Sequence, residues 1–195
     1  MQSGLEYEFE ELSAVPKLQS WAQGVFSKGV HSSIAIIPDD PSKFPELGNR
    51  KNIMIGGHEI NGKLQVKINY PNDDNRKYIK SVTPIPLPDG LTSSDEHARK
   101  MLDIAKKVPS VDYDLFGRMF GGDNQGNCNN AATTIMQESG VSQQSLGNMR
   151  KTSESEVSRD DHESIRWGWG KSLFNGDQRN QTVKNDQNKK TSRTK

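Results

Sequence analysis

The chain has one cysteine, Cys128, and its surroundings are those of a reactive thiol. It follows a segment rich in glycine and asparagine, 121–127, and begins a segment with the composition of a helix, 128–138. The N–H groups and the positive partial charge at the amino end of a helix favour thiolate over thiol. The sequence therefore predicts a nucleophilic cysteine at a helix N-terminus, with an inert buried cysteine as the alternative.

A cysteine nucleophile needs a base within hydrogen-bond reach and a third group that orients the base. Of the four histidines, His97 and His162 lie in charged stretches, and we expect both to face solvent. His31 opens a β-branched run, and His58 lies in a neighbouring candidate strand, next to Glu59. We expect His31 to be the base and His58 or Glu59 the third group. The structural alternatives are a histidine satisfied by backbone at a strand end and a polar pair on a hairpin surface.

Two strands joined by a tight turn are the clearest local structure. Residues 52–60 and 63–70 are β-type runs separated by Asn61-Gly62, a pair that favours the positive φ angles of a type I′ hairpin turn. The pair Gly56-Gly57 suggests a bulge beside this turn. Further strands are expected over 31–37 and within 77–88.

Two helices are predicted from their ends. Ser93 and Glu96 have the spacing of a capping box at the start of helix 93–108. Helix 128–138 is expected to end at Gly140. A short helix is expected over 12–27, and the apolar patch 166–174 is expected to dock onto the core. No helix or strand is predicted for the polar stretch 142–165.

Composition limits the classes of protein to consider. The chain has 195 residues and a net charge of +1, which suits one domain of ordinary size and argues against a nucleic-acid partner bound through bulk positive charge. It contains no apolar window long enough to cross a membrane, and its acidic start predicts no Sec-type signal. Residues 175–195 hold six Lys or Arg against two Asp, a net of +4. We expect a single catalytic domain over 1–174 and a disordered basic tail over 175–195.

The order of the candidate residues resembles a known group. HSSIAII (31–37), a polar residue on the next strand, and GNCNNAATTIM (126–136) resemble the circularly permuted papain-like fold of lecithin–retinol acyltransferase-like and permuted NlpC-type proteins. The resemblance implies an α+β fold in which a small antiparallel sheet packs against helices, with the cysteine at a helix N-terminus. Such domains also look like the cysteine enzyme modules of bacterial toxins and secreted effectors.

The resemblance implies a thiol mechanism on a peptide or other acyl substrate. Cys128 would attack a carbonyl carbon while His31 takes the thiol proton, with Gln125 and Asn127 as candidate oxyanion donors. We expect an amidase or peptidase that is a bacterial toxin or effector, with neither cofactor nor metal. It would be cytoplasmic or exported by a dedicated secretion system, and an immunity protein is a possible partner. The alternatives are an acyltransferase or lipid hydrolase that uses the same pair, and a non-catalytic interaction module in which Cys128 is structural.

Overall fold

The computed structural model describes residues 5–11, 30–71, 73, 79–114, 124–157 and 172–174. Several sequence predictions fall outside these residues: the helix over 12–27, the exposure of His162 and the disordered tail 175–195.

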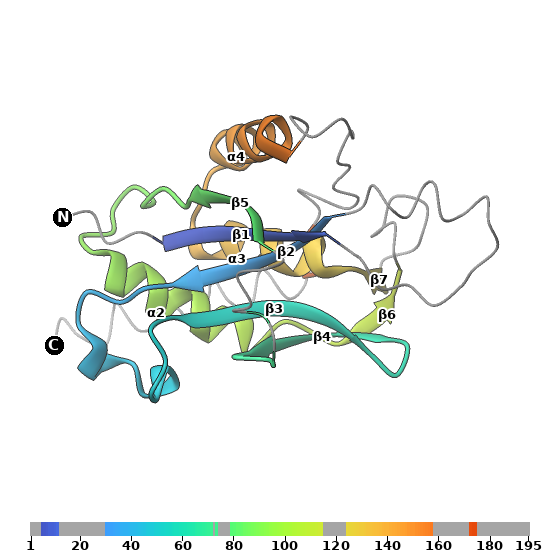
Figure 1. Cartoon of the computed structure of the whole chain (residues 1–195), viewed down its shortest axis with the longest axis horizontal. Coiled ribbons are helices and arrows are strands. Elements are labelled where there is room, and N and C mark those ends of the chain that lie inside the picture. The colour runs from blue at the N-terminus through green and yellow to red at the C-terminus, as the bar shows by residue number, and fades with distance from the viewer. Residues whose placement is uncertain are drawn as a thin grey trace, which may run out of the picture.

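A seven-stranded sheet forms the centre of the fold, with the strand order β5-β1-β2-β3-β4-β6-β7 (Figure 1). All neighbours pair antiparallel except β6 and β7, which are parallel. The fold is therefore α+β, as predicted, although the sheet is mixed and includes a strand, β1, that the sequence did not reveal. The strands are β1 (Leu5–Glu11), β2 (Val30–Ile36), β3 (Ile53–Ile60), β4 (Lys63–Ile68), β5 (Ile79–Pro84), β6 (Val111–Tyr113) and β7 (Gln125–Gly126).

The described helices are α2 (Ser94–Ala105), α3 (Cys128–Ser139) and α4 (Gln143–Val157). The first two confirm the predicted helices, and their ends have the expected chemistry. The Ser93 side chain accepts the Glu96 N–H, and Gly140 ends α3 with a φ of 113°. Helix α4 lies in the polar stretch for which no element was predicted. The loop between β2 and β3 contains two short 3-10 helices, η1 (Pro41–Lys43) and η2 (Pro45–Leu47).

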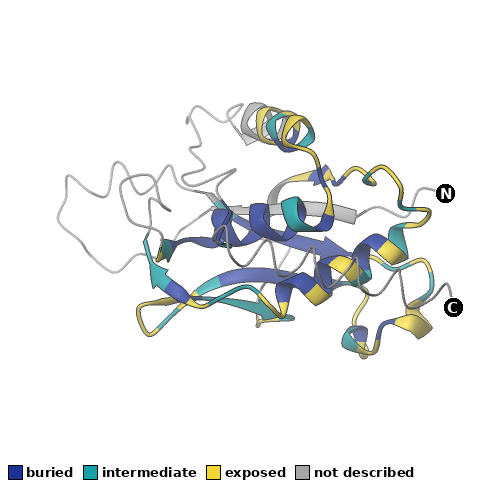
Figure 2. Cartoon of the chain, turned by 180° about the vertical axis from the view of Figure 1, so that it is seen from behind, coloured by how far each residue is buried: buried dark blue, intermediate teal, exposed yellow. Residues whose placement is uncertain are grey.

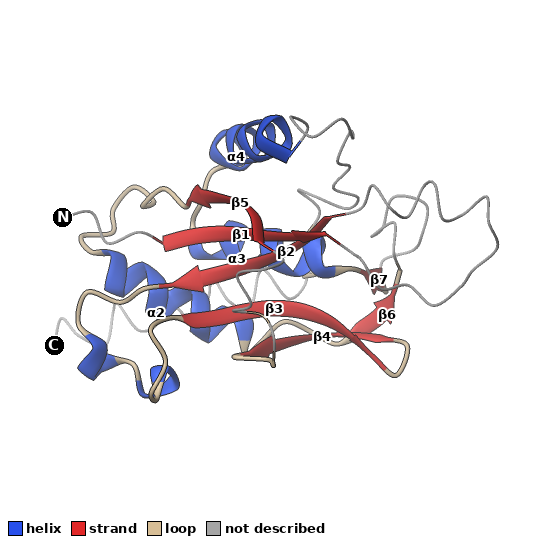
Figure 3. Cartoon of the chain, viewed as in Figure 1, coloured by secondary structure: helices blue, strands red, loops and turns tan. Residues whose placement is uncertain are grey.

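Helices α2 and α3 lie on the same face of the sheet, and α4 lies at the edge formed by β5 (Figures 1 and 3). The core between the sheet and α3 contains the side chains of Ile34, Ile36, Ile53 and Ile55, all buried. Seen from behind, the inward sides of these elements are buried and the outward side of α2 is exposed (Figure 2).

His97 corrects one sequence prediction, because it is completely buried rather than exposed. It lies on the inner face of α2, and its Nε2 is 2.9 Å from the Ser139 hydroxyl at the end of α3. The charged neighbours of His97 in the sequence lie on other sides of the helix. A residue's own position on the helix, and not its neighbours in the chain, decides which way it points.

The hairpin between β3 and β4 forms as predicted. Asn61 and Gly62 both have positive φ, 54° and 75°, as a type I′ turn requires. The predicted bulge at Gly56-Gly57 is wrong, because the pairing of β3 with β4 runs without a register shift through both glycines. Gly56 and Gly57 instead allow other groups to approach the sheet closely, one on each face.

Residues 172–174, the described part of the apolar patch predicted over 166–174, pack on the core as predicted. Leu173 is buried against Leu64, Val111 and Ala131, and its N–H donates to the Thr134 hydroxyl. The contact covers the end of the sheet near the start of α3.

Candidate functional site

Cys128 is the first residue of α3 and is buried, with 2% of its surface exposed. The helix start is fixed by a reciprocal cap. The Asn127 side chain accepts the Asn130 N–H at 3.1 Å, and the Asn130 side chain accepts the Asn127 N–H at 3.0 Å. The cap therefore holds Cys128 at the positive end of the helix dipole, the position predicted for it.

The first turn of α3 contacts two neighbouring strands. A Cβ atom added to Gly57 of β3 would lie 3.0 Å from the Cys128 Cα and 2.7 Å from the Ala131 Cβ, so only glycine permits this approach. On β2, the Ser32 hydroxyl donates to the Asn129 side-chain oxygen. Gly57 precedes His58 in the chain and Ser32 follows His31, so the helix start meets the sheet beside both histidines.

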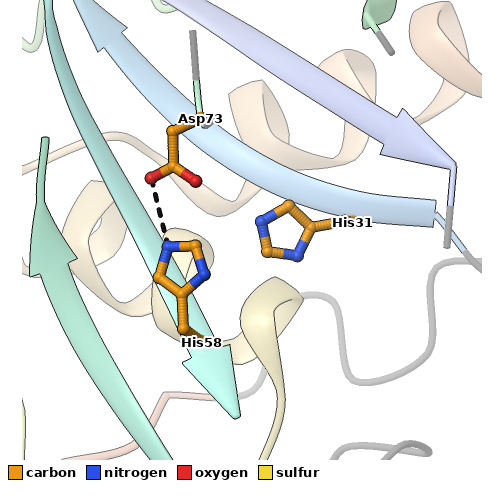
Figure 4. Close-up of side chains that lie close together, drawn as sticks. All are labelled: His31, His58 and Asp73. Carbon is orange, nitrogen blue, oxygen red and sulfur yellow. Dashed lines mark hydrogen bonds and ion pairs between the residues drawn. The ribbon is translucent and has the colours of Figure 1, made fainter. Parts of the chain in front are cut away.

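The two histidines form a cluster with an aspartate that the sequence analysis did not select. The rings of His31 and His58 have centroids 5.6 Å apart, and His58 Nε2 lies 3.1 Å from Asp73 Oδ2 (Figure 4). Asp73 is only 8% exposed. The three side chains come from β2, β3 and the loop after β4, and they point toward one another.

A well-anchored loop brings Asp73 to His58. Asn69 adopts a positive φ of 57°, its side-chain oxygen accepts the Met54 N–H, and its amide group donates to the Glu46 carbonyl. The next residue, Tyr70, stacks on the His58 ring with centroids 4.1 Å apart. His58 is therefore held by a ring on one side and a carboxylate on the other.

Gly56 provides the space that the side chains of His58 and Asp73 occupy. A Cβ atom at this position would lie 2.7 Å from His58 Nε2 and 2.9 Å from Asp73 Oδ2. Since consecutive residues of a strand point to opposite faces, Gly56 and His58 point to one face and Gly57 to the other. Gly57 contacts α3, so the imidazole of His58 lies on the face that α3 does not cover.

The same alternation applies to β2, where Ser32 points to α3 and His31 points away. The histidine cluster and the helix that carries Cys128 therefore approach the sheet from opposite sides. Within the described residues, the pairing of β2 with β3 ends at Ser33 and Gly56, immediately before the histidines. Beyond this point each strand pairs only with its outer neighbour, which leaves a gap in the ladder between the two approaches.

The remaining predicted site residues are placed as follows. Glu59 accepts the Gly62 N–H within the hairpin turn, so its carboxylate has a local role. Of the two candidates for the third group, His58 is the one that lies beside His31. Gln125 lies in β7, and Asn127 uses its side-chain oxygen in the helix cap.

Tyr113 is another residue that the sequence analysis did not select, and it lies near the Cys128 thiol. Burial raises the pKa of its phenol, and so do the negative charges of Cys128, Glu59 and Asp114. Neither Tyr113 nor Asp73 lies in a motif. Asp73 belongs to a polar loop whose sequence indicates only a turn, so no local signal could have linked it to His58.

Comparison of the chain with protein-family models, with curated proteins and with solved structures gives no match. Among the helices that the structure describes, none is long and apolar enough to cross a membrane.

Proposed function

We propose that the protein is a cysteine-dependent hydrolase of the permuted papain-like type, with Cys128 as the nucleophile and His31 as the base. The observation that carries this proposal is the placement of the first turn of α3, which contacts Gly57 and Ser32, the chain neighbours of His58 and His31. The contact occurs where β2 and β3 cease to pair. The His31 imidazole and α3 approach the sheet from opposite faces, so the thiol and the imidazole must meet at this end of the strands, where β2 and β3 no longer pair.

The chemistry is that of thiol acyl transfer. The Cys128 sulfur attacks the carbonyl carbon of an amide or ester while its proton passes to the His31 imidazole. The tetrahedral intermediate then expels the amine or alcohol, which takes the proton from His31. Water, deprotonated by the same imidazole, attacks the thioester and releases the acid and the free thiol.

His58 acts as the positioning residue for His31. The Asp73 carboxylate accepts a hydrogen bond from His58 Nε2, which fixes the tautomer and the orientation of that ring. A fixed ring 5.6 Å from His31 supports one orientation of the base. We therefore propose His58, rather than Glu59, as the third group.

The oxyanion would be stabilised by the Cys128 N–H at the helix start, together with an amide side chain. Asn127 and Gln125 both lie within three residues of the thiol. The side-chain oxygen of Asn127 serves the cap, and its NH2 group has the donor chemistry that an oxyanion requires. An amide or peptide substrate is proposed, and a matching immunity protein would follow if the chain is a toxin or effector.

Alkylation of the native protein tests the proposal directly. The rate of Cys128 labelling by iodoacetamide is followed against pH, and we expect a midpoint well below the ~8.5 of a free thiol. His31→Ala should move this midpoint upward, and His58→Gln should move it in the same direction by less. Glu59→Gln is the matched control and should leave it unchanged.

A second measurement uses bacterial growth during expression of the chain. If the protein is a toxic hydrolase, the unmodified chain slows growth and Cys128→Ala relieves the effect. A labelling midpoint near that of a free thiol, unaltered by His31→Ala, would contradict the proposal and favour the non-catalytic module. Activity on thioesters or lipids but not on peptides would instead support the acyltransferase or lipid hydrolase alternative.

A further inference from the structure

The cluster of His31, His58 and Asp73 has a second chemical capability. Each residue offers one ligand atom, and these three atoms all lie within 4.8 Å of one another. The set consists of two imidazole nitrogens and one carboxylate oxygen. In proteins this combination binds Zn²⁺ and related first-row divalent ions, and catalytic zinc sites with three such ligands keep a fourth position open.

The distances suit a metal of this size. Zinc bonds to nitrogen and carboxylate oxygen of about 2.0–2.1 Å, arranged tetrahedrally, place neighbouring ligand atoms about 3.3 Å apart. His58 Nε2 and Asp73 Oδ2 are 3.1 Å apart, so one edge of the tetrahedron is nearly formed. His31 then completes a triangle by a small rotation of its side chain.

The surroundings hold the ligands in place before any metal arrives. His31 and His58 lie on paired strands, and the loop bearing Asp73 is tied to β3 and to Glu46 through Asn69. Gly56 leaves the space between the strand and the pair open. Because the Asp73 carboxylate is almost entirely shielded from water, its attraction for a cation is stronger than at an exposed site.

We propose that His31, His58 and Asp73 form a binding site for Zn²⁺ or a first-row divalent ion of similar size, with one coordination position left for water or a ligand. The site shares His31 and His58 with the proposed thiol chemistry but uses none of the groups of α3. It also has a consequence for that chemistry. A metal on the His31 imidazole removes the base that Cys128 needs, so zinc inhibits the proposed hydrolase.

The experiment uses the full chain, freed of metal by a chelator that is then removed. Zinc is titrated against a competing chromophoric indicator, and cobalt(II) is titrated in parallel by visible absorption. We expect one equivalent of zinc to bind at micromolar or lower concentration, and the cobalt complex to show the intense visible bands of a four-coordinate site. Excess Mg²⁺, which prefers oxygen ligands, should not displace it.

The variants locate the site. His58→Gln, Asp73→Asn and His31→Ala should each weaken zinc binding by at least ~100-fold, because losing a direct ligand should cost more than losing an outer-shell partner, which costs about 10–100-fold. Glu59→Gln and Cys128→Ala are the controls and should bind zinc as the unmodified chain does. Circular dichroism establishes that each variant is folded.

The unmodified chain supplies a measurement that needs no variant. The imidazole NMR signals of His31 and His58 should shift on addition of one equivalent of zinc, while those of the buried His97 stay in place. Absence of binding, binding that all three ligand variants retain, or shifts at His97 alone would overturn the metal site. Cys128→Ala weakening zinc as much as His58→Gln would overturn the three-ligand assignment. Normal zinc binding with an unreactive thiol would leave the metal site supported and the hydrolase proposal refuted.

Discussion

Replacing Gly56 with alanine tests the arrangement of the cluster most directly. The new methyl carbon would lie 2.7 Å from His58 Nε2 and 2.9 Å from Asp73 Oδ2, whereas ordinary contacts begin at 3.4 Å. The His58 ring must therefore move by about 0.7 Å and the Asp73 carboxylate by about 0.5 Å. Since the two atoms are only 3.1 Å apart, movement of this size breaks or badly weakens their hydrogen bond.

The expected cost follows from that bond. A hydrogen bond to a charged group contributes about 1.5–3 kcal/mol, and accommodating an extra methyl group in a packed site costs a similar amount. Because part of each cost is relieved when the side chains move apart, we expect Gly56→Ala to destabilise the protein by ~2–3 kcal/mol. For a chain of this length the melting temperature should fall by about 4–12 °C.

Thermal unfolding measures the effect, and Gly147→Ala is the matched control. Gly147 lies in α4, and a Cβ atom there would have no neighbour within 4 Å, so alanine should raise stability by ~0.5–1 kcal/mol through helix propensity. A double-mutant cycle with Asp73→Ala attributes the loss to the pair, because the cost of Gly56→Ala should shrink once the carboxylate is gone. An unchanged melting temperature in Gly56→Ala, or an equal cost with and without Asp73, would refute this account of the site.

Three further outcomes are expected. Gly57→Ala acts on the opposite face: its methyl group would press on the Ala131 Cβ and the Cys128 Cα, so it should lower stability and slow the alkylation of Cys128 with little effect on the His58 ring in NMR spectra. Burial, together with the nearby charge of Lys100, lowers the pKa of His97 to about 4, so the unfolded chain protonates this imidazole more readily than the folded chain does. The free energy of unfolding is therefore highest above pH 6.5 and falls by ~3 kcal/mol as the pH drops toward 4. Urea unfolding at a series of pH values measures this fall, which His97→Gln should remove. Burial acts to raise the pKa of Glu46, but hydrogen bonds from Lys106 and Arg99 lower it to about 2. The stabilisation from these bonds should persist above pH 4.5 and fade toward pH 2, and Glu46→Gln should lower the free energy of unfolding by ~1–3 kcal/mol at neutral pH. An equal free energy of unfolding for the variant would exclude these bonds as a source of stability.

Local chemistry accounts for the parts of the fold that the sequence predicts. The turn at Asn61-Gly62, the Ser93 cap and the Gly140 helix end each depend on the backbone preferences of a few adjacent residues. The placement of Cys128 at a helix start belongs to the same group. These features need no knowledge of the rest of the chain.

The candidate site was predictable only in part, because its members lie far apart in the sequence. His31 and His58 stand on adjacent strands, as their β-type surroundings indicated. Asp73 joins them because the register of β4 and the anchored Asn69 bring its loop back over β3. Nothing in a polar turn sequence specifies such a contact.

The amino-acid sequence alone determined where the chain turns, where two of its helices begin and end, and that its only thiol sits at the positive end of one of them, because these depend on neighbouring residues. Only the tertiary structure decided which face of the sheet each side chain occupies. It set Gly56 and Gly57 to opposite faces, buried His97 and joined His58 to Asp73. The physical reason is that register and packing arise from contacts between distant segments, and a shift of one residue along a strand would exchange the two faces.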